Sequence, residues 1–299
     1  MKFIPDRGIF FIHIPKNAGK SIHRALEGQG VSFAPFAADL GVEEAEARRL
    51  ALSERRPDDT SDRHDASFDL PPFGAVHPAH LPLFVLAEKC PATFKALAEA
   101  SHSFAMTRDP RGRFFSALMQ RMKEFGDAGA IRADDKPVRD EAARVCDWLA
   151  SRDRFADLEY VHFIRQSDFV SLHGKRVLKR VFPVNRSDLL SEWLLTETGL
   201  TAEVPMSHAR RQPKRWARAV QPAARFAARR LMPHAVKKAI YPYWTGSALF
   251  DNAAGSYDKV SLGDDVEGFI KDFYAVDAAL HQEAQLQAAQ ADAKCQKAG

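Results

Sequence analysis

Short apolar runs alternate with segments of helical periodicity along the first two hundred residues of the chain. The strand-like runs cover residues 9–14, 73–77, 103–107 and 176–184. Apolar residues spaced three or four positions apart predict helices over residues 20–27, 89–100, 110–125, 138–150 and 187–198. This alternation is typical of a largely parallel sheet with helices on both faces. The pattern therefore predicts an α/β fold with a central parallel sheet flanked by helices.

Three polar segments interrupt or follow this pattern. Residues 43–67 are charged and predict a helix followed by a loop, and the Ala- and Gln-rich tail at 284–299 is expected to fray. Residues 204–250 carry ten Lys and Arg and no Asp or Glu, which leaves a net charge of −6 on the rest of a chain whose total is +4. We interpret the chain as one domain over residues 1–299, with a basic helical insertion toward the C-terminus. A basic segment on an acidic body indicates an anionic ligand or surface.

Composition places the chain among ordinary globular proteins. Its 299 residues are 45% hydrophobic and 27% charged, and no apolar run reaches the roughly 18 residues of a membrane helix. No small-residue cleavage site follows the first apolar stretch, which favours a cytoplasmic protein over a secreted one. The three cysteines, Cys90, Cys146 and Cys295, are far apart and suggest neither a disulfide framework nor a zinc site.

A basic, glycine-containing turn follows the first strand-like run, in the stretch GIFFIHIPKNAGKSIHRAL at residues 8–26. Pro15 ends the strand, and the helix that starts at Gly19 has unpaired N–H groups that favour an anion, as do the side chains of Lys16 and Lys20. An ATP-binding P-loop needs G-x-x-x-x-G-K-[ST], and its first glycine is replaced by Ile14. The turn is therefore either an anion site of another kind or a polar strand-to-helix connection.

A second segment, SFAMTRDPRGRFFSALMQRM at residues 103–122, repeats the order of strand, basic loop and helix. Asp109 is a good N-cap and Pro110 a good first helical residue. Arg108 precedes the cap and Ser116 lies about two turns into the helix, a pairing suited to a phosphate group.

A strand ending in PKxxG[TK]S followed by a strand ending in RDPxxRxxS resembles the sulfotransferases that use 3′-phosphoadenosine-5′-phosphosulfate, above all the carbohydrate branch that includes the chondroitin and heparan 2-O enzymes. The resemblance implies a P-loop-like sheet and two phosphate sites. The residues implied for the 5′-phosphosulfate are Lys16, Asn17, Gly19, Lys20 and Ser21. Those implied for the 3′-phosphate are Arg108 and Ser116. Lys20 departs from the usual Thr, and Leu118 from the usual aromatic residue.

The segment VHPAHLPL at residues 76–83 is similar to the family's Gly-His-x-Pro segment, which implies His80 as the general base. Ala79 replaces the glycine before the histidine, so His77 stays an alternative base, and both histidines could instead satisfy backbone groups in a Pro-flanked turn. His13 and His23 flank the first turn, and we interpret His13 as structural and His23 as solvated.

Looser likenesses follow in the family's order. HFIRQSDFV at 162–170 resembles a His-x-x-x-Gln segment, residues 180–200 resemble a strand-then-helix stretch, and residues 270–280 resemble a closing Tyr-x-x-Asp helix. The likeness spans about residues 8–280.

The resemblance implies transfer of a sulfonyl group from 3′-phosphoadenosine-5′-phosphosulfate to a hydroxyl, most readily on a carbohydrate such as a polysaccharide or glycolipid, without a metal. Lys16 would stabilise the leaving group and an imidazole would accept the proton. Two alternatives stay open: a nucleotide kinase with a degenerate P-loop, and a non-enzymatic module that binds anionic glycan or lipid. Residues 208–238 are either a solvated helical face or a contact for an anionic glycan or a membrane periphery. Nucleic-acid binding is not expected.

Overall fold

The computed structural model describes residues 1–52, 68–71, 73–125, 135–204, 211–213, 250–252 and 260–298. The chain divides into two compact units, one of residues 1–205 with 261–299 and the other of residues 206–260. The sequence predicts one domain, and the second unit covers nearly the same residues as the expected insertion at 204–250. Apart from one pair of short strands, the features below belong to the first unit.

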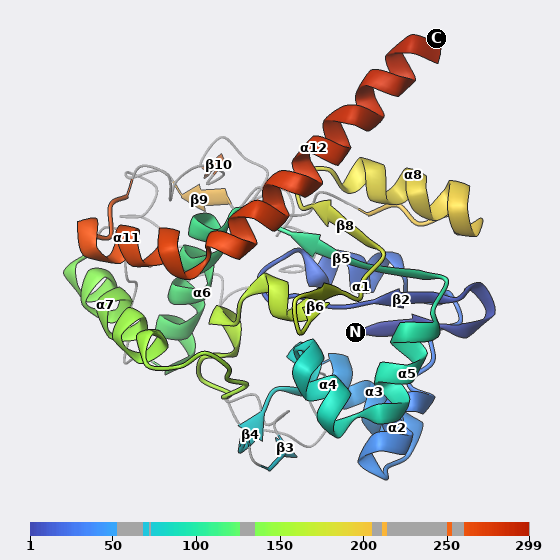
Figure 1. Cartoon of the computed structure of the whole chain (residues 1–299), viewed down its shortest axis with the longest axis horizontal. Helices are drawn as coiled ribbons and strands as arrows, with labels where there is room; N and C mark the ends of the chain where they lie inside the picture. Colours follow the sequence, from blue (N-terminus) through green and yellow to red (C-terminus); the bar gives the residue numbers. More distant parts are fainter. Residues whose placement is uncertain are drawn as a thin grey trace, which may run out of the picture. The chain divides into compact units, whose positions relative to one another are not determined.

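Four strands form the central sheet, in the order β1–β2–β5–β8 (Figure 1). β2 (Ile9–Phe11), β5 (His102–Thr107) and β8 (Arg180–Pro183) are parallel, whereas β1 (Lys2–Ile4) is antiparallel to β2. The 3₁₀ turn Pro5–Arg7 and Gly8 join β1 to β2, and so short a connection permits only an antiparallel pair. The predicted α/β class is confirmed, with a sheet that is mixed at its β1 edge. The parallel strands all end at one edge of the sheet.

One face of this sheet packs against α1 (Gly19–Ala25) and α8 (Ser187–Thr198). The buried apolar residues of this core are Ile4, Ile9, Phe11, Ile22, Leu26, Phe104, Met106, Leu190, Leu194, Leu200, Ala202 and Val204. Burying a side chain of this size contributes about 1.5–3 kcal/mol. The core therefore fixes α1 on the sheet, and with it the loop that joins β2 to α1.

The other helices surround this unit in two groups. The first group comprises α2 (Ala34–Leu40), α3 (Glu44–Leu52), α4 (Leu83–Lys89) and α5 (Pro91–Glu99). The second comprises α6 (Pro110–Phe125), α7 (Lys136–Ala150), α11 (Asp264–Phe273) and α12 (Ala275–Ala298). Short antiparallel pairs are β3 (Phe68–Asp69) with β4 (Ala75–Val76), β6 (Ser171–Leu172) with β7 (Lys175–Arg176), and β9 (Arg211–Pro213) with β10 (Phe250–Asn252). Along the described residues, no helix is long and apolar enough to cross a bilayer.

Some predicted elements have different bounds or partners. The strand expected over 73–77 is reduced to β4, which pairs with β3 and forms a single bridge from Val76 to Asp157, and the run 176–184 divides into β7 and β8. The helix expected from residue 89 begins at Pro91, because Cys90 and Pro91 separate α4 from α5. The charged segment 43–67 begins with a helix, α3, as predicted, and residues 53–67 lie outside the described part.

The tail expected to fray, residues 284–299, is part of α12, which continues to Ala298. Ala and Gln are strong helix formers, and Ala284 and Ala288 are buried in a crevice that α12 forms with β8 and α8. The Arg186 guanidinium also forms an ion pair with Asp292 at 2.8 Å.

Most of the basic segment 204–250, including all of 214–238, lies outside the described residues. Of the parts described, residues 211–213 are a strand paired with residues 250–252. The helical prediction is wrong at residues 211–213.

Candidate functional site

The loop between β2 and α1 has a strained backbone. Lys16 and Ala18 both adopt the left-handed conformation, with φ of 68° and 60°. For residues other than glycine this conformation costs on the order of 1–2 kcal/mol, and such strain concentrates at functional sites. Among the described residues, the N–H groups of Gly19 and Lys20 meet no acceptor, as expected at the start of a helix. The loop thus offers backbone donors next to two lysines.

The Lys16 side chain is directed toward α6. Its Nζ donates to Oε1 of Gln120 at 3.4 Å, and Nε2 of Gln120 in turn donates to Glu124. This contact brings the first loop against the helix that follows the second loop.

The loop between β5 and α6 has the geometry that the sequence predicts. Asp109 caps α6 by accepting the N–H of Gly112 at 2.7 Å, and its carbonyl accepts the N–H of Arg113 at 2.9 Å. Arg108, directly before the cap, is partly buried, and Ser116 is buried on α6. Both loops follow neighbouring parallel strands, so they lie at the same edge of the sheet.

Gln166 links the two loops. Its Oε1 accepts Asn17 Nδ2 at 2.6 Å from the first loop, and Thr107 Oγ1 at 3.2 Å and the Arg108 N–H at 2.9 Å from the second. Its Nε2 donates to the Arg108 carbonyl at 2.8 Å. The Gln166 backbone is held by Asp277, whose Oδ2 accepts its N–H at 2.7 Å. The resemblance includes both this glutamine and the Asp of the closing helix, and the structure brings the two together.

Arg113, the second arginine of the RDPxxRxxS segment, is a buried support to which the sequence assigns no role. Its guanidinium is 1% exposed and donates to the carbonyls of Pro15 at 3.2 Å, His162 at 3.1 Å and Ile164 at 2.6 Å. Burial lowers the pKa of this arginine. Because the Pro15 carbonyl directly precedes Lys16, Arg113 anchors the start of the first loop.

Histidines form a continuous group beside the first loop. The ring centres of His13 and His80 are 4.5 Å apart, those of His77 and His80 4.6 Å, and those of His80 and His162 5.6 Å. On the other side of His13, its Nδ1 lies 3.3 Å from Nε2 of His23. His13 and His23, interpreted from sequence as structural and solvated, therefore belong to one cluster with the candidate base, and His23 is partly buried.

Burial lowers the pKa of four of these histidines, namely His13, His23, His80 and His162. For His80 the next contribution is the neighbouring imidazole of His13, and for His162 it is the charge of Lys16. The pKa of His23 falls to about 2, with the N-terminal amine as the second cause. At neutral pH His80 is therefore uncharged, and its proton affinity is lower than that of a solvated imidazole.

His77 and His80 have different surroundings. The Nδ1 of His77 accepts the N–H of Ala79 at 3.3 Å and so caps the short 3₁₀ turn Pro78–His80. His80 is 8% exposed, and within the described residues its Nδ1 has no hydrogen-bond partner. The geometry favours a structural role for His77, whereas Nδ1 of His80 is buried without such a partner among the described residues.

Gly19 is required by the packing of this cluster. A Cβ at this position would lie 1.7 Å from Nε2 of His13. The glycine that the motif places at the start of α1 thus allows His13 to lie against the first loop.

The structure brings most of the sequence-predicted site residues to one edge of the sheet. Lys20 is exposed there, and Ser21 is buried in the first turn of α1. The Asn17 side chain is used within the protein, because Nδ2 donates to the Met106 carbonyl at 2.8 Å as well as to Gln166. Asn17 therefore holds the first loop to β5, and its own backbone N–H donates to the Ile14 carbonyl at 3.3 Å.

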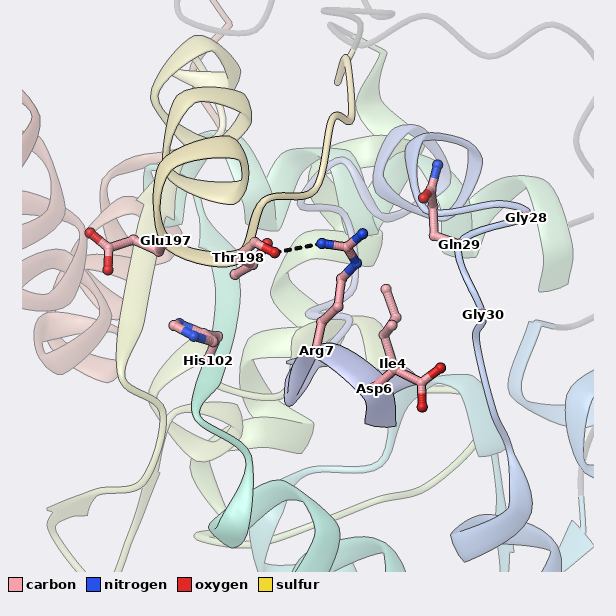
Figure 2. Close-up of a pocket in the computed structure, with 9 residues that line it drawn as sticks. All are labelled: Ile4, Asp6, Arg7, Gly28, Gln29, Gly30, His102, Glu197 and Thr198. Atoms are coloured by element: carbon pink, nitrogen blue, oxygen red, sulfur yellow. Dashed lines mark hydrogen bonds between the residues drawn. The ribbon is translucent and has the colours of Figure 1, made fainter.

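A second hollow lies at the opposite end of the strands and is shown in Figure 2. It has a volume of about 540 Å³, and its lining includes His102 at the start of β5 and Arg7 between β1 and β2. Arg7 Nη1 donates to the Thr198 carbonyl at 2.6 Å, at the end of α8. Ligands of parallel sheets bind beyond the carboxyl ends of the strands, so this hollow is separate from the candidate site.

Within the described residues, no group of three or more His, Cys, Asp and Glu side chains is arranged to hold a metal ion, the histidine cluster included. Comparisons with protein-family models, with curated proteins and with solved structures found no match. The argument for function therefore rests on the geometry of the two loops and the histidines.

Proposed function

We propose that this chain is a sulfotransferase that moves a sulfonyl group from 3′-phosphoadenosine-5′-phosphosulfate to a hydroxyl group. The observation that carries the proposal is the juxtaposition of two strand-to-helix loops, one with Lys16 and Lys20 and the other with Arg108, joined through Gln166. A donor with phosphate groups at two separate positions suits two such loops, whereas a nucleotide with a single phosphate chain needs only one.

The first loop suits the reacting end of the donor. The backbone donors of Gly19 and Lys20 and the two lysine side chains can neutralise the phosphosulfate. When the acceptor oxygen attacks the sulfur, the bond from sulfur to the bridging phosphate oxygen breaks, and its electron pair stays on that oxygen. A lysine directed at this position stabilises charge that develops only in the transition state, which is how electrostatic catalysis operates. We assign this role to Lys16.

The second loop suits the 3′-phosphate. Arg108 and the Ser116 hydroxyl supply charged and neutral donors for a phosphate group, and a charged hydrogen bond contributes about 1.5–3 kcal/mol.

His80 is the proposed base. It contacts His13, whose ring lies against Gly19 of the first loop, so the imidazole is close to the sulfonyl position. Its uncharged form can accept the proton of the acceptor hydroxyl as the new oxygen–sulfur bond forms. The products are a sulfate ester, adenosine 3′,5′-bisphosphate and the protonated imidazole.

The acceptor proposed is a carbohydrate, as a polysaccharide or a glycolipid, and the proposed location is the cytoplasm or its membrane periphery. The acceptor class follows from the sequence resemblance, and the membrane periphery follows from the basic segment. The kinase alternative is disfavoured because Ile14 is a buried residue where a P-loop needs its first glycine.

Ligand-induced thermal stabilisation tests the proposal. Adenosine 3′,5′-bisphosphate is expected to raise the Tm, by about 2.7 kcal/mol of stability at a hundred times its Kd, and to do so without magnesium. ATP with magnesium is expected to raise it far less. Stabilisation by ATP with magnesium alone would support the kinase, and stabilisation by neither nucleotide would refute donor binding. Transfer of ³⁵S from labelled donor to a panel of glycans then identifies the acceptor.

A further inference from the structure

Gln166 forms hydrogen bonds with both phosphate loops, and, given the proposed function, these bonds bear on which nucleotide the protein selects. We propose that Gln166 is the positioning residue that fixes the spacing between the two phosphate sites, and that it thereby makes the chain prefer a nucleotide with both 3′- and 5′-phosphates over one with a 5′-phosphate alone. Gln166 itself is fully buried, so it acts on the nucleotide through Asn17 and Arg108.

The hydrogen-bonding capacity of the Gln166 amide is used within the protein. Its oxygen accepts one bond from the first loop and two from the second, and its nitrogen returns a bond to the Arg108 carbonyl. The Arg108 backbone is therefore held on both its N–H and its carbonyl by one side chain. The primary amide supplies both the acceptor and the donor of this arrangement, whereas Leu supplies neither and an ionised Glu lacks the donor.

Gln166 is itself rigidly placed. The carboxylate of Asp277, which is fully buried, accepts the N–H of Gln166 at 2.7 Å and that of Ser167 at 2.9 Å. The pair of loops is thus tied to α12, an element far along the chain from either loop. On the other side, Asn17 Nδ2 bonds both Gln166 and the Met106 carbonyl of β5, so the first loop cannot shift along the sheet without breaking both bonds.

This arrangement matters most for the 3′-phosphate. The 5′-phosphate is assigned to the first loop. The 3′-phosphate is assigned to the guanidinium of Arg108, and the position of that side chain depends on the backbone that Gln166 holds. A displacement of about 1 Å in a positioning group can cost a hundredfold in a site that depends on orientation. Loss of Gln166 should therefore weaken binding of the bisphosphate more than binding of adenosine 5′-monophosphate.

A double-mutant cycle tests this inference. Calorimetry gives the Kd of adenosine 3′,5′-bisphosphate and of adenosine 5′-monophosphate for the wild type, Gln166→Leu, Arg108→Ala and the double variant. The measured quantity is the Kd of adenosine 5′-monophosphate divided by the Kd of adenosine 3′,5′-bisphosphate. If the Arg108 contact contributes about tenfold to a hundredfold in affinity, Gln166→Leu should reduce this ratio by at least about fivefold. In the Arg108→Ala background the same substitution should change the ratio by less than about twofold, because the group it positions is gone.

Two further variants separate positioning from general damage. Gln285→Leu removes a partly buried Gln of α12 whose Nε2 donates to Oδ1 of Asn185 at 3.1 Å, and it should leave the ratio unchanged. Thr107→Val removes a single bond to the Gln166 oxygen and keeps the size of the side chain, so it serves if Gln166→Leu does not fold. It should lower the ratio by about twofold or more, in proportion to one neutral hydrogen bond of roughly 0.5–1.5 kcal/mol.

The outcomes are distinguishable. If the wild type binds neither nucleotide, the proposed function fails and this inference with it. If the wild type prefers the bisphosphate and Gln166→Leu and Thr107→Val keep that preference, the positioning role is refuted while the proposed function stands. An equal loss of both nucleotides in Gln166→Leu, or an equal change of the ratio with and without Arg108, also refutes it.

Discussion

Gly19→Ala adds one methyl group at the tightest point of the candidate site. Atoms in favourable contact lie about 3.5–4.0 Å apart, whereas the new Cβ would lie 1.7 Å from Nε2 of His13. The imidazole cannot simply rotate away, because His23 lies 3.3 Å from its Nδ1 and the ring of His80 lies on another side. Movement of α1 is opposed by the core that holds this helix on the sheet. Either the histidine cluster or the first loop must therefore be displaced.

The expected cost follows from two opposing effects. Overpacking of a well-packed site lowers the free energy of unfolding by about 1–3 kcal/mol. Replacing Gly by Ala in a helix raises it by at most about 1 kcal/mol. We expect a net loss of about 1–2 kcal/mol, or roughly 2–8 °C in Tm for a domain of this size. Since the loop carries both lysines, affinity for adenosine 3′,5′-bisphosphate should also fall, by at least about tenfold, which corresponds to 1.4 kcal/mol.

Thermal unfolding followed by circular dichroism and calorimetric titration with the bisphosphate measure the two effects. Gly268→Ala is the matched control, since Gly268 lies within α11 and a Cβ there meets no atom within 4 Å. It should leave the Tm unchanged or raised. The double variant His13→Ala with Gly19→Ala should bind the bisphosphate better than Gly19→Ala alone. A Gly19→Ala protein as stable as the wild type and with the same affinity would show that His13 does not occupy this space.

Three further predictions concern the lysine, the histidines and pH. Lys16→Ala should lower kcat by about 10²–10³-fold while donor affinity falls much less, since its proposed role is in the transition state; equal losses in kcat and in donor affinity would count against that role. His80→Ala should lower kcat by about 10²–10⁴-fold and remove the acidic limb of the pH profile, whereas His77→Ala, which loses a cap of about 1 kcal/mol, should mainly lower the Tm; the reverse result would reassign the base. The folded-state pKa of the four buried histidines lies below the unfolded value of about 6.5, so their contribution to stability is fully present above pH 6.5 and is lost as the pH falls, by up to about 1.4 kcal/mol per pH unit for each. Burial raises the pKa of Asp168 to about 7, so this one carboxyl stabilises the fold as the pH falls and opposes the effect of the four histidines. Urea unfolding that shows no net loss of stability from pH 7 to pH 5.5 would contradict the lowered histidine pKa values.

The sequence predicts those elements whose signals are local. α6 begins at Pro110 and α8 ends at Thr198, as predicted, because a capping Asp-Pro pair and a clear apolar periodicity mark them. β1 was missed because three residues are too few for a periodic pattern, and its pairing depends on a tight turn. The apolar run that contains β4 predicts a longer strand, but only two of its residues form one. That short strand pairs with β3 and does not join the central sheet.

The two loops of the candidate site could be predicted, whereas the contacts that support them could not. Lys16 and Arg108 stand in short motifs that follow strands. The contacts that hold these loops join residues far apart in the chain: Asn17 to Gln166 spans 149 residues and Arg113 to His162 spans 49. Arg113 belongs to the RDPxxRxxS segment, but nothing in the local sequence shows that its guanidinium is buried against the first loop. Such residues are recognised only when the fold has brought their partners together.

The lowered pKa of His80 constrains the order of events in the proposed reaction. In the free protein the imidazole is surrounded by other histidines and by buried apolar atoms, which disfavour its charged form. A donor that fills both loops brings several negative charges to this edge of the sheet, and nearby negative charge favours the imidazolium. Proton transfer to His80 therefore becomes easier once the donor is bound, while in its absence the imidazole stays neutral. Since kcat reports ionisation in the bound complex and kcat/KM that of the free enzyme, the acidic limb should lie at a higher pH in kcat than in kcat/KM for the donor.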